Sequence, residues 1–130
     1  MDGDRIMRAF LLSFRWAFRG VGIAMRQRNF RIHLAVVVIV STLGALVGLA
    51  RGEWLAIALA CGLVLCAEAM NTALELVCDA VTRERNPVIG QAKDVAAGAV
   101  LLAALSACVV GGIVFFPILA DRLFGCPGTL

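Results

Sequence analysis

Four polar side chains recur on one face of an otherwise apolar segment near the middle of the chain. They are Glu68, Asn71, Glu75 and Asp79, and the fourteen residues from Trp54 to Ala67 before them carry no charge. At 100° per residue, the four lie within about 80° of one another on a helix and span roughly 16 Å along its axis. A charged side chain in hydrocarbon costs about 3 kcal/mol, so such residues persist where they face a bundle interior, a cation or a polar ligand.

The depth of each acid in the segment indicates a different task. Glu68 lies furthest into the apolar run, where partial removal from water would make its carboxylate a better proton acceptor. Glu75 and Asp79 lie nearer to water and could meet Mg²⁺, which proteins usually hold through one or two carboxylates and substrate phosphates. We expect these side chains to face one pocket, in an arrangement suited to chemistry on a lipid hydroxyl. A structural polar seam and an ion or proton path remain alternatives, although the other apolar runs offer no matching acids to conduct ions.

A second polar group opens the last apolar segment. Lys93 can neutralise a phosphate as a point charge, and Asp94 can be a helix N-cap or another polar partner. The sequence contains no G-x-x-x-x-G-K-[ST] motif and no strand–glycine-loop–helix pattern. P-loop and protein-kinase architectures are therefore excluded.

The elements that must position these residues are membrane helices. The chain has 130 residues, of which 62% are hydrophobic and 16% charged, whereas a soluble domain is about 45–50% apolar and about 25% charged. Three runs reach the roughly 20 apolar residues that a bilayer requires, namely 32–49, 54–77 and 95–119. No short apolar core with a cleavage site lies near residue 1, so we expect no cleaved signal peptide. The length favours one domain, 1–130.

The segment 4–28 predicts an amphipathic helix that lies on the membrane surface. Five arginines fall within about 80° of one another on a helical wheel, namely Arg5, Arg8, Arg15, Arg19 and Arg26. Apolar side chains such as Phe10, Phe14 and Phe18 occupy the opposite side. The arginines could serve as an orientation anchor alone or could also meet a polyanionic substrate.

The distribution of basic residues predicts the orientation of the chain. Ten of the twelve lie before the first span or between the second and third spans. Because basic residues gather on the cytoplasmic side, we expect the N-terminus and the active site to be cytoplasmic and the C-terminus to be outside.

Two other function classes are disfavoured by composition. The net charge of +3 is a topology signal, and without a run of Lys and Arg we expect no nucleic-acid partner. The five cysteines form no C-x-x-C pair, which disfavours a disulfide framework or a cysteine metal site.

Two motifs together resemble the prokaryotic diacylglycerol kinase/undecaprenol kinase family. The first, E-x-x-N-[ST]-x-x-E, reads Glu68-Ala-Met-Asn71-Thr72-Ala-Leu-Glu75, and the second reads Ala92-Lys93-Asp94. The resemblance covers roughly residues 14–117. It implies a multi-pass, all-α integral membrane protein of the bacterial inner membrane, a homotrimer in which a neighbouring subunit completes each active site. The implied activity is ATP- and Mg²⁺-dependent phosphorylation of a membrane lipid alcohol.

The resemblance also implies a role for each motif residue. Glu68 occupies the position of the family's proposed catalytic base, which takes the proton from the lipid hydroxyl as it attacks the γ-phosphorus of ATP. Asn71 supports the site and its substrates, and Glu75 matches the metal-binding glutamate. Three further residues match polar positions that face the nucleotide and its phosphates: Asp79, Lys93 and Asp94.

One departure from the family pattern concerns Gln27, which stands where the family usually has a second metal-binding glutamate. The amide keeps an oxygen ligand without its charge, so metal affinity could fall or another carboxylate could substitute. Gln27 is still expected to bind substrate or nucleotide. A catalytically impaired nucleotide-binding scaffold remains an alternative function for the protein.

The lipid substrate is indicated by two segments, 29–34 and 93–104, which look more like the undecaprenol kinase branch. They favour undecaprenol, giving undecaprenyl phosphate, over diacylglycerol, giving phosphatidic acid. His33 lies in the first segment, although a lone histidine at a span end can be structural.

Overall fold

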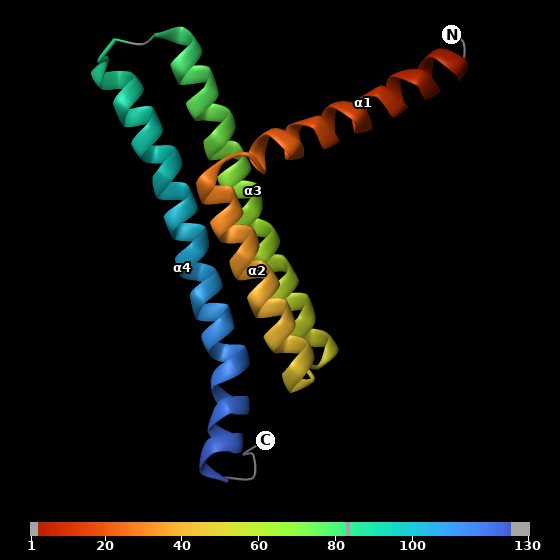
Figure 1. The fold of residues 1–130 in the computed structure, drawn as a ribbon, viewed down its shortest axis with the longest axis vertical. Coiled ribbons are helices and arrows are strands. Elements are labelled where there is room, and N and C mark those ends of the chain that lie inside the picture. Colours follow the sequence, from red (N-terminus) through yellow and green to blue (C-terminus); the bar gives the residue numbers. More distant parts are fainter. Residues whose placement is uncertain (1–2, 83, 126–130) are drawn as a thin grey trace.

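The computed structural model describes residues 3–82 and 84–125, which form four α-helices. In chain order these are α1 (Gly3–Ala24), α2 (Arg28–Val47), α3 (Arg51–Val81) and α4 (Pro87–Phe124). Helices α2, α3 and α4 run alongside one another in alternating directions, and α1 projects away from them (Figure 1). The all-α class is confirmed, and α2, α3 and α4 are each long and apolar enough to cross a membrane.

The three bundle helices differ in length, which determines where the polar residues lie. At 1.5 Å per residue, α2 is about 30 Å long, whereas α3 is about 46 Å and α4 about 57 Å. Helices α3 and α4 therefore continue beyond the start of α2, where α1 joins it, and meet in a connection that we call the loop end (Figure 1).

The first helix is shorter than the predicted surface helix 4–28, which is wrong at its C-terminal boundary. α1 ends at Ala24, and the backbone N–H groups of Arg26 and Gln27 donate to carbonyls only three residues earlier, at 3.1 and 2.9 Å. These bonds form a tight turn, from which α2 begins at Arg28. The position of α1 on a membrane surface stays a prediction.

The last helix begins eight residues before the predicted span 95–119. The side-chain oxygen of Asn86 accepts hydrogen bonds from the N–H groups of Val88 and Ile89, at 2.9 and 3.4 Å. Pro87 follows at the first helical position, where its fixed φ suits a helix and its missing N–H has no cost. Asp94 therefore lies two turns inside α4, and its alternative role as an N-cap is wrong.

The opposite end of the bundle is closed by a tight turn between α2 and α3. Gly48 adopts the left-handed conformation with φ of 79°, and the N–H groups of Gly48 and Leu49 both donate to the carbonyl of Gly44, at 3.0 and 3.1 Å. Leu49 and Trp54 pack so closely on Gly44 that an added Cβ would lie 2.8 and 3.1 Å from them. Leu49 also joins Ile57 of α3 and Val114 of α4 in a buried apolar cluster.

This close contact predicts that a larger residue at position 44 destabilises the fold. We expect Gly44→Leu to lower the free energy of unfolding by about 1–3 kcal/mol, the usual effect of overpacking a core. The measurement is the midpoint of thermal unfolding in detergent. Gly62→Leu on α3 is the control, because an added Cβ at Gly62 meets nothing within 4 Å. Equal midpoints for the two variants would contradict the packing described above.

Candidate active site

The buried polar residues of the bundle lie in two consecutive turns of α3. Among the described residues, Glu68, Asn71 and Thr72 are the polar side chains that are buried, with exposed fractions of 3%, 5% and 4%. They lie at the level where α1 meets α2, because Thr72 and its α3 neighbours line a groove of about 600 Å³ together with residues 20–24 and Phe30. The α1–α2 junction therefore covers this part of α3.

Three polar side chains of α3 form what we call the inner group: Glu68, Asn71 and Glu75. The Asn71 side-chain amide donates to a carboxylate oxygen of Glu75 at 3.3 Å. Glu75 and His33 of α2 both lie near enough to Glu68 for their charges to act on its carboxylate. The inner group thus combines a buried acid with an amide and a half-buried acid on one face of the helix.

The carbonyl oxygen of Asn71 has no partner in this arrangement. It is buried, and no donor from the described residues reaches it. A buried polar atom without a hydrogen bond costs about 1–3 kcal/mol. Its environment is therefore suited to a bound molecule that supplies an O–H or N–H donor, or to a cation.

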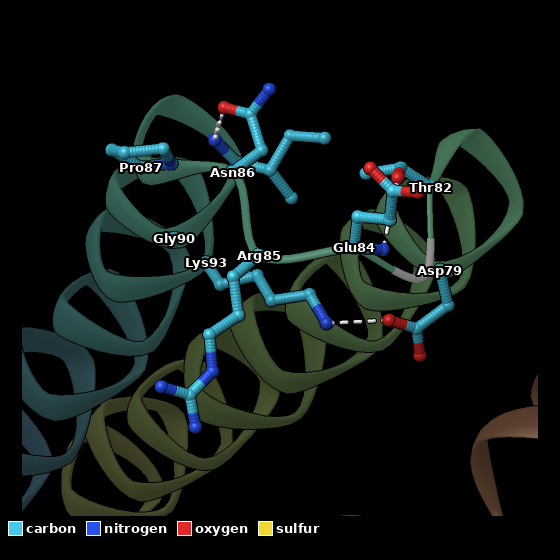
Figure 2. A pocket seen from close by; sticks show the side chains of 9 residues that line it. Asp79, Thr82, Glu84, Arg85, Asn86, Pro87, Gly90 and Lys93 are labelled. Carbon is cyan, nitrogen blue, oxygen red and sulfur yellow. Dashed lines mark hydrogen bonds and ion pairs between the residues drawn. The ribbon is translucent and has the colours of Figure 1, made fainter.

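The outer group is an ion pair between α3 and α4 near the loop end. The Lys93 ammonium donates to a carboxylate oxygen of Asp79 at 2.5 Å, and Figure 2 shows Lys93 reaching across to Asp79. Both residues line an open cleft of about 740 Å³, the outer cleft, together with Glu84 and Arg85 of the connection. This cleft is exposed, lined in part by charged side chains and large enough for a small charged ligand.

The structure therefore separates the polar stripe into two groups. Asp79 and Lys93 line the outer cleft, whereas Glu68, Asn71 and Glu75 do not. Within the described residues, the outer cleft does not extend to Glu68, Asn71 and Glu75, as the expected common pocket would require. Glu68 and Asp79 are eleven residues apart on α3, which corresponds to roughly 16 Å. The stripe runs from a buried acid to an exposed ion pair.

The two remaining predicted residues lie apart from these groups. Gln27 is half-buried at the N-cap of α2, where its side chain makes no capping hydrogen bond. Asp94 is exposed on α4. Within residues 3–82 and 84–125, neither side chain forms a hydrogen bond or ion pair with the inner or outer group.

Sequence reasoning gave too little weight to two kinds of residue. His33 is half-buried and lies within electrostatic range of Glu68, and the available signal was that it is the only histidine of the chain. Glu84 and Arg85 belong to the wall of the outer cleft. Their polar character was visible in the sequence, but their approach to Asp79 depends on how α3 and α4 pack.

The donor set fits a magnesium ion that arrives with phosphates. The described part of the chain has no group of three or more His, Cys, Asp or Glu residues placed to hold a metal ion. Mg²⁺ is usually held by one or two carboxylates plus substrate phosphates. Glu75 offers a carboxylate oxygen that Asn71 does not engage, and Asn71 adds its unpaired carbonyl oxygen. These are oxygen donors of the kind that Mg²⁺ prefers.

Comparison with known proteins assigns the chain to a family. The family model described as prokaryotic diacylglycerol kinase matches residues 15–115. An undecaprenol kinase of Bacillus subtilis (strain 168) is 39% identical over 117 residues, which cover 89% of this chain and 95% of that protein. A diacylglycerol kinase of Synechocystis sp. is 46% identical over 109 residues, which cover 82% of this chain and 62% of that protein. The predicted resemblance is thus confirmed across most of the chain, and this chain belongs to the prokaryotic diacylglycerol kinase family of lipid kinases.

Proposed function

We propose that the chain transfers the γ-phosphate of ATP, bound with Mg²⁺, to the hydroxyl of a membrane lipid alcohol, with undecaprenol favoured over diacylglycerol. The observation that carries this proposal is the gradient along α3. A buried carboxylate at Glu68 lies roughly 16 Å from an exposed Asp79–Lys93 pair beside a polar cleft. Such a helix offers one end to a lipid and the other to a charged, water-soluble phosphate donor.

Glu68 is the proposed catalytic base. In the reaction, the lipid oxygen forms a bond to the γ-phosphorus while its proton passes to the Glu68 carboxylate. The bond between the γ-phosphorus and the β–γ bridging oxygen breaks, and ADP leaves with that electron pair. Burial of Glu68 excludes water from the position of the lipid hydroxyl, which disfavours transfer of the phosphate to water.

The other residues bind and orient the nucleotide in this proposal. Glu75, oriented by its hydrogen bond from Asn71, would hold Mg²⁺, which neutralises phosphate charge when bound. Lys93 would bind a phosphate oxygen, and Asp79 holds its ammonium in place. Gln27 and Asp94 are proposed to complete the binding of the nucleotide–metal complex.

The proposed setting is the bacterial inner membrane, with the loop end in the cytoplasm. The exposed apolar side chains of α1 support its placement on a lipid surface, since Phe10, Phe14 and Phe18 are 57%, 50% and 74% exposed. Phe10 and Phe14 stack edge to face with 5.0 Å between ring centroids. Arg19 lies over the ring of Trp16 at 5.6 Å.

A homotrimer is part of the same proposal. The bundle buries few side chains, and the outer cleft is open. A neighbouring subunit could close the outer cleft and bring further residues to the nucleotide.

The lipid substrate is the second part of the proposal. Undecaprenol is favoured by the segments 29–34 and 93–104. The Synechocystis relative is called a diacylglycerol kinase, which keeps diacylglycerol as the second candidate. Both substrates present one hydroxyl, so Glu68 alone cannot discriminate between them.

The role of Glu68 predicts the effect of a conservative substitution. Glu68→Gln keeps the shape of the side chain but removes its ability to accept the proton, so we expect kcat to fall by about 10²–10⁴-fold. The measurement is transfer of labelled phosphate from ATP to undecaprenol, and to diacylglycerol in parallel. Asp121→Asn, an acid-to-amide change far from the site on α4, should keep wild-type turnover. Equal turnover of Glu68→Gln and wild type would exclude the base role.

The role of Lys93 predicts a different kinetic signature. Lys93→Gln removes a charge-assisted hydrogen bond to phosphate, a loss of about 1.5–3 kcal/mol. We therefore expect KM for ATP to rise about 10- to 100-fold while KM for the lipid stays unchanged. Arg51→Gln, at the opposite end of α3, is the control for loss of one positive charge. An unchanged KM for ATP in Lys93→Gln would show that Lys93 only pairs with Asp79.

Substitution of Gln27 allows a gain-of-function test. The same test addresses the alternative that the protein is a catalytically impaired nucleotide-binding scaffold. If Gln27 faces the metal, Gln27→Glu restores a charged ligand and lowers the Mg²⁺ concentration for half-maximal activity by about tenfold, equivalent to ~1.4 kcal/mol. Gln27→Ala should raise that concentration. Nucleotide binding without turnover in the wild type would support the scaffold alternative. The same Mg²⁺ dependence in all three proteins would place Gln27 away from the metal.

A further inference from the structure

A narrow apolar cleft runs between all three bundle helices on the side of Glu68 away from the loop end. Its volume is about 370 Å³, and its walls come from residues 32–40 of α2, 57–64 of α3 and 104–115 of α4. We call it the three-helix cleft. Among the described residues of its wall, His33 is the one basic side chain and none is a carboxylate; the remaining lining is aliphatic, aromatic, glycine or cysteine.

One end of the three-helix cleft reaches the buried acid of the inner group. Val64 lines the cleft, and Glu68 follows one turn later on the same face of α3. His33 lines the cleft as well and lies near enough to Glu68 for their charges to interact. The unpaired carbonyl oxygen of Asn71 is buried in the next turn. The apolar space therefore ends one turn of α3 before a buried proton acceptor, and a buried oxygen that lacks a donor follows further along the helix.

The dimensions of the cleft suit one hydrocarbon chain. Its lining residues lie within stretches of nine positions of α2 and eight of α3, roughly 12 Å along the helices, and of twelve positions of α4, roughly 17 Å. A volume of about 370 Å³ over these lengths gives a cross-section of about 20–30 Å². This width accommodates one extended chain more readily than two side by side.

We propose that the three-helix cleft binds the hydrocarbon chain of the lipid alcohol and places its hydroxyl at Glu68, and that it accepts a single linear chain in preference to the paired chains of a diacylglycerol. The inference rests on the proposed function and adds to it a substrate-binding site within one protomer. A prenyl alcohol fulfils both requirements, since it has one chain and one terminal hydroxyl. The hydroxyl can give its proton to Glu68.

The groove between α1 and α3 is a less suitable binding site for the hydrocarbon chain of the lipid. It is larger, at about 600 Å³, but no acid or base lines it. A lipid bound there would have its hydroxyl beside Thr72, whose side chain is a weak proton acceptor. The three-helix cleft is preferred because it lies on the face of α3 that carries Glu68 and has His33 in its wall.

Two neighbouring glycines of α4 allow a matched test. Gly111 lines the three-helix cleft, and an added Cβ there meets nothing within 4 Å. Leucine at this position can therefore fill the cleft without striking the backbone. Gly112 is exposed, does not line the cleft and is equally open. Gly111→Leu and Gly112→Leu thus make the same chemical change in the same helix, but only the first blocks the cleft.

The kinetic measurement compares prenyl alcohols whose hydrocarbon chains differ in length. Gly111 lies seven residues beyond Ala104 on α4, roughly 10 Å further along the cleft, so a five-carbon prenol bound at Glu68 is too short to reach it. We expect Gly111→Leu to raise KM for undecaprenol at least tenfold, while Gly112→Leu stays within twofold of wild type. All three proteins should phosphorylate the five-carbon prenol equally, which shows that each one is folded and catalytically intact.

The binding arm does not depend on catalysis. A fifteen-carbon prenol with a diazirine at its tail should cross-link wild type and Gly112→Leu near Phe115 and Ile57, and this labelling should be lost in Gly111→Leu. Equal KM values for undecaprenol together with unchanged labelling would overturn the inference, as would labelling confined to α1. Cross-links that join two copies of the chain through the cleft would show that a second subunit occupies it instead. If wild type phosphorylates no alcohol, the proposed function fails, and the labelling pattern still decides whether a prenyl chain binds in the cleft.

Discussion

The burial of one carboxylate in an apolar helix constrains the rest of this molecule. Glu68 is 3% exposed in a helix that is otherwise apolar enough to cross a membrane. A charge in that position is unfavourable unless polar partners or a ligand compensate for it. Among the described residues, the one favourable charged neighbour is His33 on α2, whereas Glu75 carries a like charge that opposes it, with Asn71 between the two acids on α3. The α1–α2 junction lies at the same level and shields this turn of α3.

Because the helices differ in length, the polar face of α3 extends from the apolar interior of the bundle to the exposed loop end. Because α3 and α4 continue past the start of α2 (Figure 1), the same face of α3 that buries Glu68 later carries Asp79 next to Lys93. A polar cleft opens there, and an apolar cleft lies on the other side of Glu68. A lipid kinase has to bring the phosphate of a water-soluble donor into contact with the hydroxyl group of a lipid in the membrane. In the account proposed here, that meeting point is the inner group.

Much of this architecture follows from local patterns in the sequence. The spacing of Glu68, Asn71 and Glu75 is helical, and the three apolar runs correspond to the three bundle helices, so both could be predicted. The start of α4 could also have been found, since Asn86-Pro87 is a strong helix-start signal. The span prediction missed it because residues 87–94 are too polar to count as membrane segment, although they are helical.

The features that sequence reasoning could not supply are those that depend on packing between helices. The division of the stripe into two groups arises because the α1–α2 junction covers one part of α3 and Lys93 of α4 reaches another. The proximity of His33 to Glu68 depends on how α2 packs on α3. The three-helix cleft is formed jointly by residues far apart in the chain, such as Val36, Cys61 and Gly111. None of these contacts leaves a periodic signal in a single sequence.

Glu68 is, on this proposal, a buried acid reached from the lipid side and not from water. Labelling with carbodiimides tests it directly, because these reagents modify carboxyl groups and come in apolar and water-soluble forms. The account predicts that dicyclohexylcarbodiimide modifies Glu68, that added undecaprenol protects it, and that a water-soluble carbodiimide modifies Asp79 but spares Glu68. Modification of Glu68 by the water-soluble reagent, or no protection by any lipid alcohol, would contradict the account.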